Sequence, residues 1–439
     1  ADGFGDNTEE VYSPGTAYIV YAEEIAKLTG NPLAAWYAEE CKKYETPDFS
    51  ATPLMRWIRL TKTRELALPS VTTKPDLPTG VVFRDIGLAA LHSNIKNTPE
   101  NLMVAFKSSP LGSYGHMLCD QNTFNILYGG QRLFFRTGYK VTMDDPHRTG
   151  WYRTTKSQNG ILINGEGQTY SNDAFGWISR FMQGDEIAYL KGDASNAWKN
   201  EETNEPEVKK VVRHLILLKP DVIVIYDELE SGKEVSWSWL IHSMEKMEVD
   251  PGNGTFTVIL PTVKGAGKIF SSQEMQWALA DTFDVPAVNW RKSRYADGRL
   301  KTYDDPQWHL KVSSFGKSSV MRCLAVLQIS PDTNPDSLLS GSKPDEHGKV
   351  DITVGQWSVS ASMNTNFPPD LLIQKTDKKA AFSIHSKEIN LNGEKFNGSQ
   401  ANSSFLIEMK NDKAIIQEVT DSIPQMMKNV MLYHQILQK

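Results

Sequence analysis

Two patterns of hydrophobic positions divide the chain into a short helical part and a long β part. Over residues 14–30 the apolar side chains recur every three to four residues, which predicts an amphipathic helix. The members of this pattern are Ala17, Val20, Tyr21, Ile25 and Leu28. Ser13 and Pro14 are typical of a helix start and Gly30 of a helix end. "NPLAAWYAEECKKY", capped by Asn31, and "ATPLMRWIRLT" predict two further helices.

Over residues 81–329 the pattern changes to short apolar or alternating runs separated by turn signals, which predicts many strands. Alternating runs are typical of half-buried strands, and solidly apolar runs of the inner layer of a sandwich. "LALPSVTTKPDLPTG" reads as a linker, and a second Gly/Ser/Pro/Asp-rich break covers 330–349. We therefore expect a helical segment (1–65), a linker (66–80), a large β domain (81–330) and a small β domain (331–439).

Composition narrows the class of protein. The net charge of −6 argues against a general nucleic-acid binder, so an anionic partner must meet a local basic patch. The apolar runs contain charges and a proline, and none predicts a membrane span. The three cysteines are sparse and far apart, which predicts buried free thiols rather than a disulfide framework.

One segment concentrates polar chemistry. "TFNILY" and "QRLFFRTGY" flank Gly129 and Gly130, a strong signal for a hairpin turn. Alternation places Arg132, Phe134 and Arg136 on one face of the second strand and Leu133, Phe135 and Thr137 on the other. The next residues are rich in bases and aromatic rings: Lys140, His147, Arg148, Trp151, Tyr152, Arg153 and Lys156.

This segment favours a surface for a polyanion with apolar faces, such as a uronic-acid polysaccharide, because arginine suits carboxylate recognition. The alternative is a set of solvated strand residues with no common target. His116, in the Gly-rich loop before the hairpin, suits proton transfer near neutral pH, or is a satisfied loop histidine. Asp120 and Asn122 stand beside turns, where such residues usually bond nearby backbone.

The stretch "FKSSPLGSYGHMLCDQNTFNILYGGQRLFFRTGYK" resembles the central signature of the heparinase II/III-like family of polysaccharide lyases. That signature is a Ser/Gly loop, a histidine, Asp-Gln-Asn with an aromatic, and a Gly-turn hairpin. "PHRTGWYRTTKSQNGILINGEGQ", "GDASNAW", "VVRHLILLKPDVIVIYDEL" and "SWLIHS" match in order, so the resemblance covers roughly 1–330. It implies a mainly β fold: a large antiparallel β-sandwich of supersandwich type. The last helices of an (α/α) toroid precede this sandwich, and a small β domain follows it.

The resemblance also implies an activity, which is cleavage of a uronic-acid-containing, glycosaminoglycan-like polysaccharide by β-elimination. Most of the toroid, with the family's catalytic tyrosine, would lie outside this chain. The expected partners are therefore the acidic polysaccharide and a helical portion, with no nucleic acid and no membrane. Family habit implies a periplasmic or secreted bacterial protein, trimmed at its start.

Many family members hold zinc at positions that here are Leu118, Arg136 and Gln158, none of which suits zinc. We expect no cofactor, with the zinc site lost and the charge of Arg136 in its place. A different divalent metal at His116, Asp120 and His147 is the alternative.

In the implied mechanism the substrate carboxylate is neutralised, a base removes the C5 proton, and an acid protonates the oxygen on C4. The candidate residues are His116 as base or carboxylate partner, Tyr139 as acid, and Arg136, Arg148, Trp151 and Arg153 for substrate binding. A non-catalytic polysaccharide-binding sandwich, or a lyase fragment without its toroid, is the first alternative. The second is a glycoside hydrolase that pairs Asp120 with Asp144 or Asp145.

Overall fold

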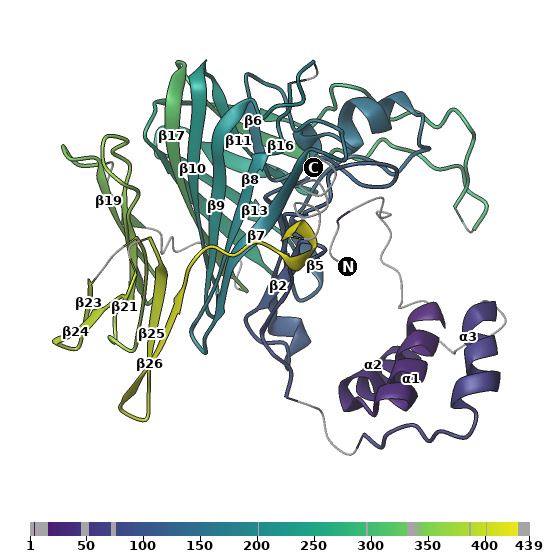
Figure 1. The fold of residues 1–439 in the computed structure, drawn as a ribbon. Coiled ribbons are helices and arrows are strands. Elements are labelled where there is room, and N and C mark those ends of the chain that lie inside the picture. The colour runs from purple at the N-terminus through teal and green to yellow at the C-terminus, as the bar shows by residue number, and fades with distance from the viewer. Residues whose placement is uncertain are drawn as a thin grey trace, which may run out of the picture. The chain divides into compact units, whose positions relative to one another are not determined.

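The computed structural model describes Phe4 and residues 16–44, 52–71, 76–200, 202–295, 297–331, 340–341, 344–385, 388–400 and 402–428. The chain forms two compact units, a helical one over Thr8–Pro78 and a β unit over Thr79–Lys439 (Figure 1). No helix among the described residues is long and apolar enough to cross a membrane.

The helical unit has the three helices that the sequence predicts: α1 (Thr16–Thr29), α2 (Pro32–Lys42) and α3 (Pro53–Ile58), which a π-helical turn (Arg59–Thr63) continues. The side chain of Asn31 caps α2 by accepting a hydrogen bond from the backbone N–H of Leu33. Gly30 ends α1 with a φ of +69°. The expected cap residues Ser13 and Pro14 lie outside the described residues.

The apolar stripe expected on α1 is largely exposed in this chain. Tyr21, Ile25 and Leu28 are open to solvent, whereas Glu23 and Glu24 are buried. Both carboxylates bind Arg59, at 2.6 and 2.7 Å. The helices therefore meet through a small core and ion pairs, and a large apolar surface of this unit stays uncovered.

The β unit contains four main sheets, all with antiparallel pairing. The five-stranded sheet has the order β1-β2-β3-β4-β5, with β1 Gly80–Phe83, β2 Leu88–His92, β3 Leu102–Lys107, β4 Thr123–Tyr128 and β5 Gln131–Phe134. The four-stranded sheet has the order β15-β16-β11-β6, with β6 Ile161–Ile163, β11 Trp237–Ser243, β15 Met275–Ala280 and β16 Trp308–Ser314.

The eight-stranded sheet has the order β12-β13-β14-β17-β10-β9-β8-β7. Its strands are β7 Phe175–Gln183, β8 Ile187–Asn196, β9 Val208–Leu218, β10 Val222–Val235, β12 Met247–Asp250, β13 Thr255–Ile259, β14 Lys264–Ser271 and β17 Ser318–Ser330.

The carboxyl-terminal sheet has the order β18-β19-β20-β21-β22-β25-β26, and a separate hairpin is formed by β23 and β24. The bounds are β18 Ser340–Gly341, β19 Lys349–Val354, β20 Trp357–Ser362, β21 Leu371–Lys375, β22 Ala380–Ile384, β23 Glu388–Leu391, β24 Glu394–Asn397, β25 Ser404–Lys410 and β26 Lys413–Val419. Short helical turns lie at Thr98–Glu100, Arg148–Tyr152 and Thr155–Ser157.

The eight-stranded sheet is the middle layer, and its central strands are buried on both faces. Leu215 and Leu217 of β9 point into a core shared with the five- and four-stranded sheets, and Ile216 and Leu218 into a core shared with the carboxyl-terminal sheet. Figure 1 shows the strands β19, β21, β25 and β26 to one side of this middle layer. The prediction of a mainly β, antiparallel sandwich is thus confirmed.

Two buried pairs of charged or polar side chains lie on opposite faces of β9 and β10. Arg213 is directly opposite Asp227 in the register, and its Nε is 2.7 Å from the Asp227 Oδ1. His214 points to the other face, where its Nε2 lies 2.9 Å from the Oε1 of Glu228. Because side chains alternate along a strand, the side chains of adjacent residues lie in the cores on opposite faces of the sheet.

The hairpin prediction is confirmed at the turn, but the predicted alternation is wrong after it. Gly129 and Gly130 both have positive φ, as a tight hairpin turn requires. The pairing then slips, because Leu127 pairs with Arg132 but Ile126 pairs with Phe134. The bulge buries both Leu133 and Phe134 and ends the strand before Arg136. Arg132 stacks on Phe135, which alternation placed on the opposite face.

The cysteines are as expected. Cys41, Cys119 and Cys323 are buried and free.

Candidate functional site

The loop between β3 and β4 carries His116, and polar residues at its end fix it to the sandwich. The Oε1 of Gln121 accepts a hydrogen bond from the backbone N–H of Ser109 across the base of the loop. Asn122, with a φ of 55°, donates from Nδ2 to the carbonyl oxygens of Gly192 and Val211. We expected Asn122 to bond nearby backbone, but its partners belong to β8 and β9, far away in sequence. The amide of Asn122 therefore holds the loop to the middle sheet, and the amide of Gln121 closes its base.

His116 itself is exposed, at the tip of this anchored loop. Two side chains converge on the carbonyl oxygen of the residue before it, Gly115. The Nη2 of Arg148 donates at 2.7 Å and the hydroxyl of Tyr170 at 3.0 Å. The backbone that carries the imidazole is thus held from inside, while the ring remains at the surface.

Most of the aromatic and basic segment packs inside the protein. Arg148 is only 1% exposed and Trp151 only 5%. The indole of Trp151 packs against the rings of Phe283 and His309, with centroids at 5.4 and 4.6 Å, and these two rings also contact each other. In this conformation Trp151 is too buried to offer a ring face to a sugar, and Arg148 contacts the loop at the carbonyl oxygen of Gly115.

Tyr139 is also buried, and its hydroxyl donates to the carbonyl oxygen of Asp305 at 2.8 Å. Its backbone N–H donates to the Nε2 of His147 at 3.0 Å, and the Nδ1 of His147 bonds the carbonyl oxygen of Val285 at 2.6 Å. Both ring nitrogens of His147 therefore make hydrogen bonds to backbone, one to Tyr139 and one to Val285.

Arg136 and Asp120 belong to an internal charge cluster. The Nη2 of Arg136 donates to the hydroxyl of Tyr152 at 2.9 Å, and its guanidinium lies over that ring. Asp120 is fully buried and binds the ammonium of Lys107 at 2.5 Å. Burial raises the pKa of Asp120, while the charges of Lys107 and Arg136 oppose that shift. A carboxylate enclosed in this way does not face a sugar, which removes the basis for a glycosidase that uses Asp120.

The residues present do not fit the zinc that the family resemblance implies. Leu118 has no ligand atom, Arg136 places a cation there, and the Nε2 of Gln158 donates to the Oγ of Ser157 at 2.7 Å. His116, Asp120 and His147 also fail to form a cluster of ligand atoms within the part of the chain that the structure describes.

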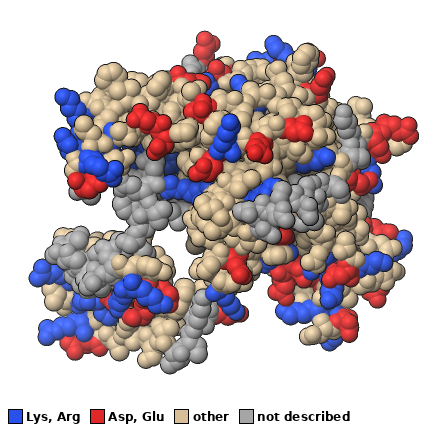
Figure 2. Space-filling view, turned by 180° about the vertical axis from the view of Figure 1, so that it is seen from behind, with Lys and Arg blue, Asp and Glu red and all other residues tan. Residues whose placement is uncertain are grey.

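A groove of about 800 Å³ is connected to the His116 loop through Tyr170, which lines the groove and bonds Gly115. Its wall includes Tyr170, whose ring carries the guanidinium of Arg153 at 4.0 Å. Lys156 and Lys199 line the groove together with acidic residues, so its charge is mixed. Figure 2 likewise shows basic and acidic side chains intermingled over the face in view. Recognition of an anion here would depend on a few local cations rather than on a broad field.

Two residues near His116 were missed at the sequence level. Tyr170 follows the Gly-x-Gly-Gln segment and both holds Gly115 and supports Arg153. Tyr114 is 56% exposed and lies in the same turn as His116, which the hydrogen bond from Met117 N to its carbonyl oxygen closes at 2.9 Å. In the sequence, each of these tyrosines stands close to a glycine-containing loop, and this position could have identified both as candidates.

Comparisons with known proteins agree with this architecture. A model of the heparinase II/III-like family, carboxyl-terminal part, matches residues 75–303. A heparinase III with methylated lysines superposes with a TM-score of 0.52 at 13% identity, over 90% of this chain and 49% of that chain. The heparan sulfate lyase HepC from Pedobacter heparinus gives 0.52 at 10% identity, over 91% and 49%. No curated protein matches the sequence.

The chain therefore spans about half the length of these solved structures, and the likeness at such low identity concerns the fold. The family model covers more than half of the chain. On the strength of that match and of the shared sandwich, this chain belongs to the heparinase II/III-like family.

Proposed function

We propose that this chain is the β-sandwich part of a polysaccharide lyase that cleaves a uronic-acid-containing, glycosaminoglycan-like polymer by β-elimination. The supporting observation is the exposed His116 on backbone that Arg148 and Tyr170 hold through Gly115. A catalytic group must be accessible and held in place. The exposure of His116 and the hydrogen bonds to the preceding residue support this role. Membership of the family supports the lyase class.

In the proposed reaction a cation or hydrogen-bond donor neutralises the substrate carboxylate, which makes the C5 proton acidic. The imidazole of His116 accepts that proton, the C4–C5 double bond forms, and the bond from C4 to the leaving oxygen breaks. An acid then protonates the leaving oxygen. A histidine suits the first transfer because its ordinary pKa is near 6.5.

The acid is a tyrosine in this proposal, and the two candidates in the chain differ in accessibility. Tyr139 would act only after its hydroxyl leaves the carbonyl of Asp305. Tyr114 is exposed beside His116 and needs no such rearrangement. We therefore place Tyr114 ahead of Tyr139 within this chain. The family resemblance assigns the role to a tyrosine of the toroid, which is the alternative source.

We assign substrate binding to Arg153, whose guanidinium stacks on Tyr170, a residue of the groove wall. Arg136, Arg148 and Trp151 act from inside in this proposal, by keeping the loop and its surroundings in place. We further propose that the exposed apolar side chains of the helical unit pack against other helices of an (α/α) toroid. A periplasmic or secreted location completes the proposal, because the polymer is found outside the cytoplasm.

The test is ultraviolet absorbance of the unsaturated uronide product, with hyaluronan, chondroitin sulfate, heparan sulfate, alginate and gellan as substrates. We expect product from one polymer with the unaltered chain and with a His347→Ala control, and none with His116→Ala. Tyr114→Phe and Tyr139→Phe compare the two acids in the same assay. Binding of a polymer without product would favour the non-catalytic alternative, and full activity of His116→Ala would overturn the mechanism.

A further inference from the structure

A second polar cluster lies on the face of the eight-stranded sheet that the carboxyl-terminal sheet covers. His214 comes from β9, Glu228 from β10, and His385 from the residue directly after β22. The Oε1 of Glu228 is 2.9 Å from the Nε2 of His214 and 3.5 Å from the Nε2 of His385. One ligand atom from each of the three lies within 4.8 Å of the others, and no other such group of three occurs among the residues described.

These distances suit a common ion. Zinc binds imidazole nitrogen and carboxylate oxygen at about 2.0–2.2 Å, so neighbouring ligand atoms of a tetrahedral site lie roughly 3.3–3.5 Å apart. The Oε1 of Glu228 lies 2.9 and 3.5 Å from the two imidazole nitrogens, and all three ligand atoms lie within 4.8 Å of one another, so small side-chain movements would give this spacing. Two imidazoles and one carboxylate also form the donor set that zinc and similar transition metals prefer.

His385 supplies an independent indication that a partner belongs here. Its Nε2 is buried and makes no hydrogen bond to any described residue. The contact with Glu228 is longer than a normal hydrogen bond. Leaving a buried polar nitrogen unsatisfied costs free energy, and an ion shared with His214 and Glu228 would satisfy it.

The groups behind the three residues resemble the supporting layer of a metal site. The Nδ1 of His214 lies 2.9 Å from the hydroxyl of Tyr189, which accepts a hydrogen bond from the Oγ of Ser404. The Oε2 of Glu228 accepts from Lys210 at 3.2 Å, which leaves Oε1 for an ion. Metal-bound histidines and carboxylates usually have such partners on their other atoms.

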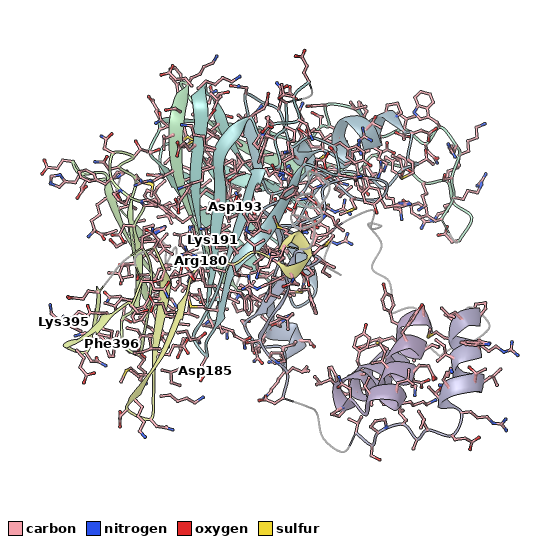
Figure 3. All side chains as sticks on the ribbon, viewed as in Figure 1. Arg180, Asp185, Lys191, Asp193, Lys395 and Phe396 are labelled. Atoms are coloured by element: carbon pink, nitrogen blue, oxygen red, sulfur yellow. The ribbon has the colours of Figure 1, made fainter. Side chains whose placement is uncertain are left out.

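The charges around the cluster are already paired. Arg180 and Lys191, which Figure 3 labels on β7 and β8, both bind Asp421 at 2.9 Å. Lys210 is paired with Glu228, and its side chain is partly exposed to water. Asp370 adds a carboxylate that interacts electrostatically with His385. Because each of these basic side chains is already paired with a carboxylate, their charges would oppose the binding of a divalent cation only weakly.

We propose that His214, Glu228 and His385 bind one zinc-like divalent transition-metal ion, with water as a fourth ligand. Because two ligands belong to the middle sheet and the third to the carboxyl-terminal sheet, the ion joins these two layers. The site is separate from His116, and the proposal does not depend on lyase activity.

The test uses the full chain, stripped with a chelator and then titrated with Zn²⁺ against a chromophoric chelator, or with Co²⁺. We expect one ion per chain, visible absorption bands typical of tetrahedral Co²⁺, and a Tm that rises with Zn²⁺. His385→Ala should abolish all three effects, while the matched control His347→Ala, which removes an exposed histidine, should retain them.

Tyr189→Phe distinguishes a metal site from a mere polar network, because it should weaken Zn²⁺ binding about 10- to 100-fold without removing a ligand. His385 follows its strand and is partly exposed, so His385→Ala is expected to fold, and its circular dichroism spectrum verifies this. Absence of stoichiometric Zn²⁺ binding, or equal binding by His385→Ala and the unaltered chain, would overturn the proposal.

Discussion

Arg148 donates a hydrogen bond of 2.7 Å to the carbonyl oxygen of Gly115, the residue that immediately precedes His116. A buried guanidinium thus fixes the backbone under an exposed imidazole. Arg148 belongs to the basic segment 140–156, which the sequence predicted to be a surface for a polyanion. In the structure its side chain is buried and supports the loop from inside. Its effect on the reaction would be on orientation rather than on contact with substrate.

Tyr170→Phe tests this positioning, because it removes one of the two hydrogen bonds to Gly115 and keeps the ring under Arg153. We expect a loss of stability of about 1 kcal/mol, the usual net value of one hydrogen bond. In lyase assays kcat should fall more than KM changes. Tyr44→Phe, which removes an exposed hydroxyl from the helical unit, is the control. An unchanged kcat in a destabilised Tyr170→Phe would show that the hydrogen bond serves only the fold.

Lys107→Met should strongly destabilise the protein, because it leaves the fully buried Asp120 without its ion-pair partner. Breaking such a pair from one side costs about 3–5 kcal/mol. The double variant Lys107→Met/Asp120→Leu should recover part of the loss, since it removes the unpaired carboxylate and leaves Arg136 as the remaining charge of the cluster. Urea unfolding of the single and double variants measures both effects. If Lys107→Met were as stable as the unaltered protein, a buried ion pair between Lys107 and Asp120 would be contradicted.

Acid should destabilise the sandwich through His309. Burial lowers the pKa of His309 to about 4, against an ordinary value near 6.5. The unfolded chain therefore binds this proton first as pH falls. The stabilising contribution is fully present above about pH 6.5 and is lost toward pH 4, with a total of about 3 kcal/mol.

Chemical unfolding between pH 7 and 4 tests this prediction, and His309→Gln should show a shallower dependence. His242 is buried beside His309, and its pKa is also lowered by burial, so part of the slope should remain in that variant. Identical slopes for both proteins would exclude His309 as a contributor.

Gly192→Ala should destabilise the anchoring of the His116 loop, whereas Gly316→Ala should be tolerated. A Cβ at Gly192 would overlap the side chain of Asn122 and the ring of Phe106, but one at Gly316 meets open space. Overpacking of this kind typically costs about 1–3 kcal/mol. Thermal unfolding of the two variants gives the comparison. Equal Tm values would mean that the loop shifts without cost.

The elements themselves were largely predictable, because local patterns determine them. The hairpin at Gly129-Gly130, the cap at Asn31 and the strands on both sides of "LKPD" follow from turn chemistry and hydrophobic runs. The bulge after Arg132 was not predictable, since one extra residue in a strand leaves the composition unchanged. It shifts the pairing of Leu133 and Phe134, and the strand ends directly after them.

The chemistry of single residues was less predictable, because burial is decided by distant segments. Trp151 becomes internal through Phe283 and His309, which lie more than a hundred positions further along the chain. His385 belongs to a part of the sequence without any recognisable motif, and only the stacking of two sheets brings it to Glu228. Periodicity identifies strands but not which sheets will face one another.

The Arg213–Asp227 ion pair and the polar His214–Glu228 pair, on opposite faces of β9 and β10, also specify the register of these two strands. Both strands contain a long apolar stretch, 215–218 in β9 and 222–226 in β10, and sliding one stretch along the other would cost little hydrophobic contact. A slip by one residue would turn Arg213 and His214 to the wrong layers, and a slip by two would part Arg213 from Asp227. Each misalignment leaves bare charge in a dry interior. The buried polar pairs thus select one strand register among several that hydrophobic contacts alone would make nearly equal in free energy.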